Sequence, residues 1–202
     1  MNIQRSAGII CHPTSFPNKF GIGDLGPEAF HFLEFMESCG QTLWQVFPLG
    51  PTGYGDSPYQ CFSAFAGNPL LISPELLLQD GLLTWAQIET DEKHNPHSID
   101  FGPVIEAKYK LLRSAYEAYK LQTQHSYRKD LEKFKKENDF WLDDYSLFMA
   151  VKAYHGGALW TTWDEEIALH KKAAVKKWKE KLSDDINYQV FLQYVFSRQW
   201  HA

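Results

Sequence analysis

The residues best suited to binding a ligand lie in one stretch, residues 50–68. It combines turn-forming Gly and Pro with polar side chains and with four aromatic residues in twelve positions: Tyr54, Tyr59, Phe62 and Phe65. Such rings need cover, either from the body of the protein or from a ligand with apolar faces. A sugar ring is such a ligand, since its C–H faces stack on aromatics while Asp, Ser, Gln and Tyr bind its hydroxyls. The commoner alternative is a long loop folded back on the core.

The elements around this stretch predict how it is positioned. Residues 42–47 form a short apolar run of strand length, and residues 7–11 (AGIIC) predict an earlier, buried strand. Between them, residues 27–39 carry a wide apolar stripe at helical spacing and end before Gly40. Strand, helix and strand in this order predict two parallel strands. Residues 50–68 then follow the carboxyl end of the second strand, where α/β folds place their sites.

Residues 21–26 match the G-x-G-x-x-G pattern of dinucleotide sites. Such a site needs its glycines directly after the first strand and a bare helix N-terminus for the phosphate. Here the strand ends about ten residues earlier, and Asp24 and Glu28 bring negative charge to that position. We therefore exclude a dinucleotide cofactor. Asp24 is predicted to cap the following helix, and the glycines to permit tight turns beside a pocket.

The remainder of the chain reads as helical. Ser73 and Pro74 begin a short helix, and a capping box from Thr84 to Gln87 begins another. From about residue 103 we find no strand signal. Further helices are predicted within 105–119, 131–154, 164–182 and 184–200, with an aromatic turn at 159–163. The polar residues 91–96 mark the predicted boundary between an α/β part, 1–100, and a helical part, 101–202.

Composition limits the class of protein. The chain is 44% hydrophobic and 22% charged, which is typical of a globular protein, and its 15% aromatic content is high. A net charge of −5 argues against nucleic acid or an anionic membrane as partner, and no apolar run is long enough to span a membrane. Acidic residues flank the lysines of 171–181, which indicates a solvated helix face. Cys11, Cys39 and Cys61 lack metal-ligand spacing, so we expect reduced thiols and a cytoplasmic protein.

Three segments resemble a known family: IICHPTSFP, FGIGDLGPEAFHFL and LWQVFPLGPTGYGDSPYQCFSAFAGNPLLISPELLLQDGLL. They resemble the N-terminal region of the amylomaltases, the 4-α-glucanotransferases of glycoside hydrolase family 77. The resemblance runs from about residue 5 to 83, and PTGYGDSPYQ-x-FSAFAGNP is its most specific string. It implies an α/β fold in which the two strands begin a (β/α)8 barrel. It also implies that the helical part is an insertion subdomain and that the barrel is incomplete in this chain.

The resemblance implies transfer of a 1,4-α-glucan segment to a new 4-position of glucose or glucan, through a covalent glycosyl-enzyme. Retaining chemistry needs two carboxylic groups about 5 Å apart. In this family they come from strands later than residue 202, so we expect no catalytic residue here and no activity from this chain alone. The implied partners are 1,4-α-glucans and maltooligosaccharides, with no metal or organic cofactor. Two alternatives remain, a non-catalytic glucan-binding module and an inactive truncated fragment with exposed barrel edges.

The resemblance implies substrate contacts for individual residues of the loop. Tyr59 matches the family tyrosine that lies against the sugar at the cleavage subsite, where an aromatic face favours a developing oxocarbenium ion. Ser57 is expected to bind sugar hydroxyls. Asp56 and Gln60 either do the same or stabilise the loop. Tyr54, between glycines, is a candidate for a separate glucan platform.

Four residues outside the loop are weaker candidates for a role in the site. Phe101 stands where family members often carry Tyr, which leaves a polar contact there in doubt. His12 follows the first strand and is more often a packed loop histidine than a proton shuttle. Trp160 and Trp163 either line an acceptor groove or, more commonly, pack the helical part.

Overall fold

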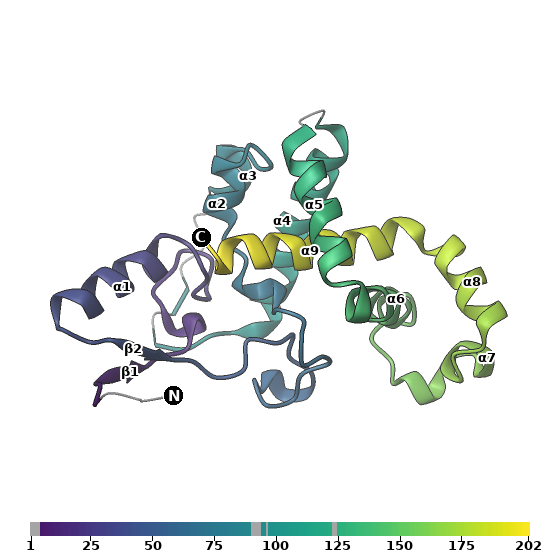
Figure 1. Cartoon of the computed structure of the whole chain (residues 1–202), viewed down its shortest axis with the longest axis horizontal. Helices are drawn as coiled ribbons and strands as arrows, with labels where there is room; N and C mark the ends of the chain where they lie inside the picture. The colour runs from purple at the N-terminus through teal and green to yellow at the C-terminus, as the bar shows by residue number, and fades with distance from the viewer. Residues whose placement is uncertain (1–4, 90–93, 96, 123–124) are drawn as a thin grey trace. The chain divides into compact units, whose positions relative to one another are not determined.

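The computed structural model describes residues 5–89, 94, 95, 97–122 and 125–202, without the side chains of Tyr54, His125 and Ser126 (Figure 1). The chain forms two compact units. The first comprises residues 1–122 with 195–202, and the second comprises residues 123–194. Each unit is described by itself.

A parallel pair of strands joined by a helix opens the first unit. Strand β1, Gly8–Ile10, pairs with β2, Leu43–Gln45, so that Ile9 lies opposite Trp44. Helix α1, Pro27–Ser38, connects the two strands, as Figure 1 shows. The predicted order of strand, helix and parallel strand is therefore confirmed. Cys11 N–H extends the pairing by donating to the carbonyl of Gln45 at 3.1 Å.

The predicted burial of the first strand is wrong for this chain. Ile10 is 61% exposed and Leu43 is 54% exposed. On α1, the side chains of Phe30, Leu33 and Phe35 are exposed as well. A parallel sheet is buried on both faces only when helices and further strands cover it, and here the sheet has two strands.

The predicted helix cap at Asp24 is also wrong. The N-cap of α1 is Gly26, which has no side chain to cap it. Asp24 instead accepts a hydrogen bond from Gly26 N–H through Oδ1 at 3.0 Å and pairs through Oδ2 with Lys108 Nζ at 2.7 Å. A bend of the chain, rather than a capping geometry, turns this carboxylate inward. Burial raises the pKa of Asp24 and lowers that of Lys108, and the attraction between the two charges opposes both shifts.

Short helical elements complete the first unit. They are η1 Pro13–Ser15, η2 Tyr54–Asp56, η3 Pro69–Leu71, α2 Pro74–Gln79, α3 Trp85–Ile88 and α4 Phe101–Leu121. Ser73 caps α2 by accepting from Leu76 N–H, and Gln87 Oε1 accepts from Thr84 N–H at 2.8 Å, so both predicted helix starts are confirmed. The core is fully buried at Leu71, Ile72 and Leu77.

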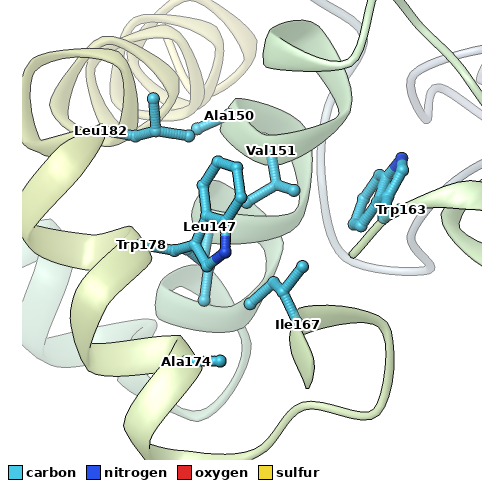
Figure 2. Packing of buried hydrophobic residues seen from close by; sticks show 8 residues of the cluster. All are labelled: Leu147, Ala150, Val151, Trp163, Ile167, Ala174, Trp178 and Leu182. Atoms are coloured by element: carbon cyan, nitrogen blue, oxygen red, sulfur yellow. The ribbon is translucent and has the colours of Figure 1, made fainter. Parts of the chain in front are cut away.

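The second unit is helical throughout its described residues. It contains α5 His125–Glu137, α6 Asp139–Tyr154, η4 Trp160–Thr162, α7 Glu165–Ala168 and α8 Lys172–Lys181. Helix α9, Ser183–Trp200, contributes its residues up to 194 to this unit and the following ones to the first. Figure 2 shows the core of the second unit, which consists of Leu147, Ala150, Val151, Trp163, Ile167, Ala174, Trp178 and Leu182.

The single helix predicted over 164–182 is wrong, because the chain breaks it into α7 and α8. Leu169 ends α7, and His170 has a φ of +51°, in the left-handed region that an α-helix cannot include. Lys171 then serves as the N-cap of α8. The sequence has no glycine at this break, so the helical pattern of residues 164–182 gave no indication of it.

The predicted boundary at 91–96 lies largely outside the described residues, since residues 91–93 and 96 are among those left out. The compact units divide at residue 122, with α4 in the first unit. The division into a barrel part and a helical insertion remains a prediction about the fold family. No helix in the described part of the chain has both the length and the apolar character needed to cross a membrane.

Candidate functional site

Residues 50–68 fold into a narrow ribbon. Thr52 and Cys61 form an antiparallel bridge. On either side of it, Gly53 N–H donates to the carbonyl of Gln60 at 2.8 Å, and Phe62 N–H donates to the carbonyl of Pro51 at 3.2 Å. The two arms of the ribbon therefore hold residues 54–59 at its tip.

The tip is a tight turn that places four of the predicted site residues together. Gly55 and Asp56 both have positive φ, at +69° and +54°. The hydroxyl of Ser57 accepts from Tyr59 N–H at 3.3 Å, and its carbonyl accepts from Gln60 N–H at 3.0 Å. Asp56 and Ser57 are half-buried, whereas Tyr59 and Gln60 are exposed. The side chain of Tyr54 lies outside the described part of the tip.

Tyr59 stands at the edge of an open groove. Its side chain is 71% exposed and packs against the ring of Phe47, with the two centroids 5.9 Å apart and the planes inclined by 49°. The groove has a volume of about 480 Å³. Besides Tyr59, its lining consists of Pro48, Leu49, Gly50, Pro58, Cys61, Ser63, Ala64, Phe65, Ala66, Gly67 and Phe196. An exposed aromatic face above a mixed apolar and polar groove is the geometry that a sugar ring needs.

Phe47 also contacts His12, a histidine that follows strand β1. The ring of His12 stacks on Phe47 with 5.9 Å between centroids and an angle of 20°. His12 Nδ1 lies 2.8 Å from Thr14 Oγ1. Burial lowers the pKa of His12, and the neighbouring backbone of Pro48 opposes this shift. These contacts favour a packed histidine that is hydrogen-bonded to Thr14. Phe47 thus contacts the rings of both His12 and Tyr59.

The two phenylalanines of the loop are partly open to solvent. Phe65 is 62% exposed and Phe62 is 39% exposed. Phe65 lies in the lining of the groove. The end of the loop, by contrast, packs on the protein body, since Ala66, Gly67 and Asn68 are buried.

The remaining candidates lie elsewhere. Phe101 begins α4 and lines a different, larger groove of about 680 Å³ together with Phe16 and the polar residues Thr14, Asn18 and Ser98. Of the three glycines in residues 21–26, Gly21 lines the same groove and has a φ of +76°. Trp160 and Trp163 belong to the second unit and line a pocket of their own.

The sequence reasoning missed Lys108 and its ion pair with Asp24. Both side chains are 1% exposed, and Lys108 Nζ also donates to the carbonyl of Ile72 at 2.7 Å. The available signal was spacing, because Val104, Lys108 and Leu112 follow one another every four residues along the buried face of α4. A charge on such a face needs a buried partner.

The described residues contain no group of three or more His, Cys, Asp or Glu side chains able to hold a metal ion. The cysteines Cys11, Cys39 and Cys61 are free thiols. The turn at the tip of the loop brings together an aromatic face, a hydroxyl, a carboxylate and an amide.

Comparison with known proteins identifies the family. A family model described as 4-alpha-glucanotransferase, glycoside hydrolase family 77, matches residues 11–202. The 4-alpha-glucanotransferase of Synechocystis sp. is 40% identical over 197 residues, which are 98% of this chain and 39% of that protein. The enzyme of the same name from Clostridium butyricum is 44% identical over 192 residues, which are 94% of this chain and 38% of that protein.

A solved structure agrees with the sequence matches. The amylomaltase from Streptococcus agalactiae, in complex with acarbose, matches with a TM-score of 0.92 and 33% identity, over 98% of this chain and 40% of that one. The chain thus spans about two fifths of the length of these relatives. The resemblance noted in the sequence is confirmed, and the chain belongs to the 4-alpha-glucanotransferase family, glycoside hydrolase family 77.

Proposed function

We propose that these residues form the N-terminal portion of a 4-α-glucanotransferase. In this proposal β1 and β2 are the first strands of a (β/α)8 barrel, and the helical residues from about 101 onward are an insertion. The parallel register of the two strands supports it, as does the match to an amylomaltase over 40% of its length. The uncovered side chains of Ile10, Leu43 and α1 support it too, since the rest of a barrel would cover them.

The observation that carries the functional proposal is the position of Tyr59. Its ring is largely exposed, lines a groove and packs against Phe47. We assign it the stacking contact with a glucose unit of a 1,4-α-glucan or maltooligosaccharide. Ser57, Asp56 and Gln60 surround the same turn and supply hydrogen-bonding groups for sugar hydroxyls. Tyr54 is assigned to the site by its place in η2 and by the family motif.

The reaction is transfer of a glucan segment with retention of configuration. A carboxylate attacks the anomeric carbon while a carboxylic acid protonates the leaving oxygen, and the acceptor's 4-hydroxyl then displaces the enzyme. We assign neither group to these residues, since in the family both belong to later barrel strands. The contribution of this chain is to bind and orient the sugar. A cytoplasmic setting, where the three thiols stay reduced, belongs to the same proposal.

Two measurements test the proposal. Calorimetric titration of the purified 202-residue chain with maltoheptaose should show binding that Tyr59→Ala weakens. Maltotriose, the substrate of a disproportionation assay, should release no glucose with the same chain. Unchanged binding by Tyr59→Ala would refute the assignment of the site, and glucose release would refute the assignment of the catalytic groups elsewhere.

A further inference from the structure

We propose that the second unit carries a separate sugar-binding pocket, between α6 and the turn formed by η4 and α7, in which Trp160 provides the stacking face for one pyranose ring. The choice of a 1,4-α-glucan as ligand rests on the proposed function of the chain. That the pocket suits a sugar ring is argued from the second unit alone. This unit lies within residues 123–194 and contains every residue of the pocket.

One wall of the pocket is a single face of α6. Asp144 and Phe148 are four residues apart, as are Leu147 and Val151, so these side chains form one stripe along the helix. The opposite wall consists of Trp160, Trp163, Ile167, Ala168 and His170. The pocket is open to solvent on one side and has a volume of about 330 Å³. That lies at the small end of the range for ligand pockets, roughly 300–1,000 Å³, and it favours one ring over an extended peptide.

The two tryptophans have different environments. Trp163 is 9% exposed, donates from its indole nitrogen to the carbonyl of Ala158 at 3.3 Å and stacks on His155 with 5.6 Å between centroids. In Figure 2 its ring lies on the other side of Val151 from Trp178. Trp163 is thus a fixed part of the core, which explains why it lines the pocket without being open to solvent.

Trp160, by contrast, is 51% exposed. Its backbone is held by the η4 turn, in which Thr162 donates to the carbonyl of Leu159 from both N–H and Oγ1, at 2.9 Å and 2.7 Å. Trp163 N–H donates to the carbonyl of Trp160 at 3.2 Å. A rigid backbone under a half-exposed indole gives a stacking platform at low entropic cost, because little freedom remains to be lost on binding.

Polar groups stand at the rim of this pocket. Asp144 Oδ1 lies 3.7 Å from His170 Nε2, and both side chains are largely exposed. A sugar ring presents apolar C–H faces and polar edges, so it matches an indole with a carboxylate and an imidazole beside it. Because both side chains are largely exposed, they keep polar atoms that the hydroxyls of such a ring can bind.

The test separates this pocket from the Tyr59 groove. Maltoheptaose is titrated into the 202-residue chain carrying Tyr59→Ala, and into the same chain carrying Tyr59→Ala and Trp160→Ala. We expect binding to persist in the first and to weaken about tenfold or more in the second. Trp85→Ala, added instead of Trp160→Ala, is the matched control, since Trp85 is a 71% exposed tryptophan of the first unit. Circular dichroism melting shows whether each variant is folded.

The outcomes are distinct. Binding that Trp160→Ala removes, Trp160→Phe partly restores and Trp85→Ala leaves unchanged supports the pocket. Absence of binding in the Tyr59→Ala chain, or equal binding with and without Trp160→Ala, overturns it. Failure of the proposed function gives a different result, in which Tyr59→Ala binds maltoheptaose as tightly as the unmodified chain. Tighter binding of cellohexaose than of maltoheptaose at Trp160 would overturn the choice of a 1,4-α-glucan.

Discussion

Asp24 and Lys108 form a fully buried salt bridge in which Asp24 Oδ2 lies 2.7 Å from Lys108 Nζ. The pair joins the glycine-rich turn before α1 to the middle of α4. Lys108 also donates to the carbonyl of Ile72 at 2.7 Å and lies 5.5 Å from the ring centre of Phe20. Both charges therefore have partners on several sides, which is what a buried charge requires.

Removing one partner of this pair should destabilise the first unit strongly. We expect Lys108→Met to lower the free energy of unfolding by about 3–5 kcal/mol, because it leaves the Asp24 carboxylate buried without its counter-charge. Adding Asp24→Asn should recover part of that loss, since the amide oxygen can still accept from Gly26 N–H without carrying a charge. Urea titration of the single and double variants measures the coupling. A Lys108→Met chain as stable as the unmodified one would show that the pair contributes nothing.

Phe47 is expected to position Tyr59 for the sugar. Its ring contacts both Tyr59 and His12, so replacing it by Leu keeps the apolar volume but loses both stacks. We predict that Phe47→Leu weakens maltoheptaose binding by about 0.5–1.5 kcal/mol, or roughly two- to tenfold in Kd. Phe35→Leu on α1, a 54% exposed phenylalanine away from the groove, is the control. If Phe47→Leu binds normally while Tyr59→Ala does not, the tyrosine needs no such support.

Gly67 permits a close approach that a larger residue would block. A Cβ at this position would lie 2.0 Å from the Phe196 ring, so Gly67→Ala must displace α9 or the loop. Overpacking of this kind costs about 1–3 kcal/mol. Gly102→Ala serves as the comparison, since a Cβ there meets nothing closer than 3.8 Å and α4 gains up to about 1 kcal/mol in helix propensity. Thermal melting should thus move in opposite directions for the two alanines, and a drop of equal size in both would contradict the steric argument.

The order of elements was predictable because it depends on local patterns. The apolar runs predict strands, Gly40 predicts the end of a helix, and the capping box at Thr84 predicts the start of another. Each signal acts within a few residues, and the structure has the corresponding strand or helix in each case. Exposure of Ile10 was not predictable, because the burial of a strand depends on what covers it. The break between α7 and α8 was not predicted, because the residue with positive φ is His170 and no glycine indicates it in the sequence.

The candidate site was predictable in part for the same reason. Tyr59 and Ser57 were identified from a motif within one loop, and the turn that joins them is local. The support from Phe47 and the pairing of Asp24 with Lys108 join residues distant in sequence. Such contacts arise only when separate elements meet, and nothing in the individual segments specifies their partners.

Because of Tyr109, the stability of the first unit should fall at alkaline pH. It packs beside the buried cluster of Ile22, Leu70 and Val104, and although part of the ring reaches the surface, burial raises the pKa of its phenol to about 12. The unfolded chain loses this proton near pH 10. The folded state therefore binds more protons than the unfolded state between about pH 10 and 12, and stability falls as the pH rises through this window. A shift of this size corresponds to at most about 2–3 kcal/mol.

Tyr109→Phe isolates this contribution, because it removes the ionisable hydroxyl and keeps the ring. Denaturation of both chains at pH 9 and at pH 11.5 should show a smaller loss of stability for the variant. Absorbance of tyrosinate during an alkaline titration of the folded chain gives an independent measure, since one phenol fewer should titrate at the high end. Equal pH dependence in the two chains would mean that Tyr109 ionises as readily in the folded protein as in the unfolded one.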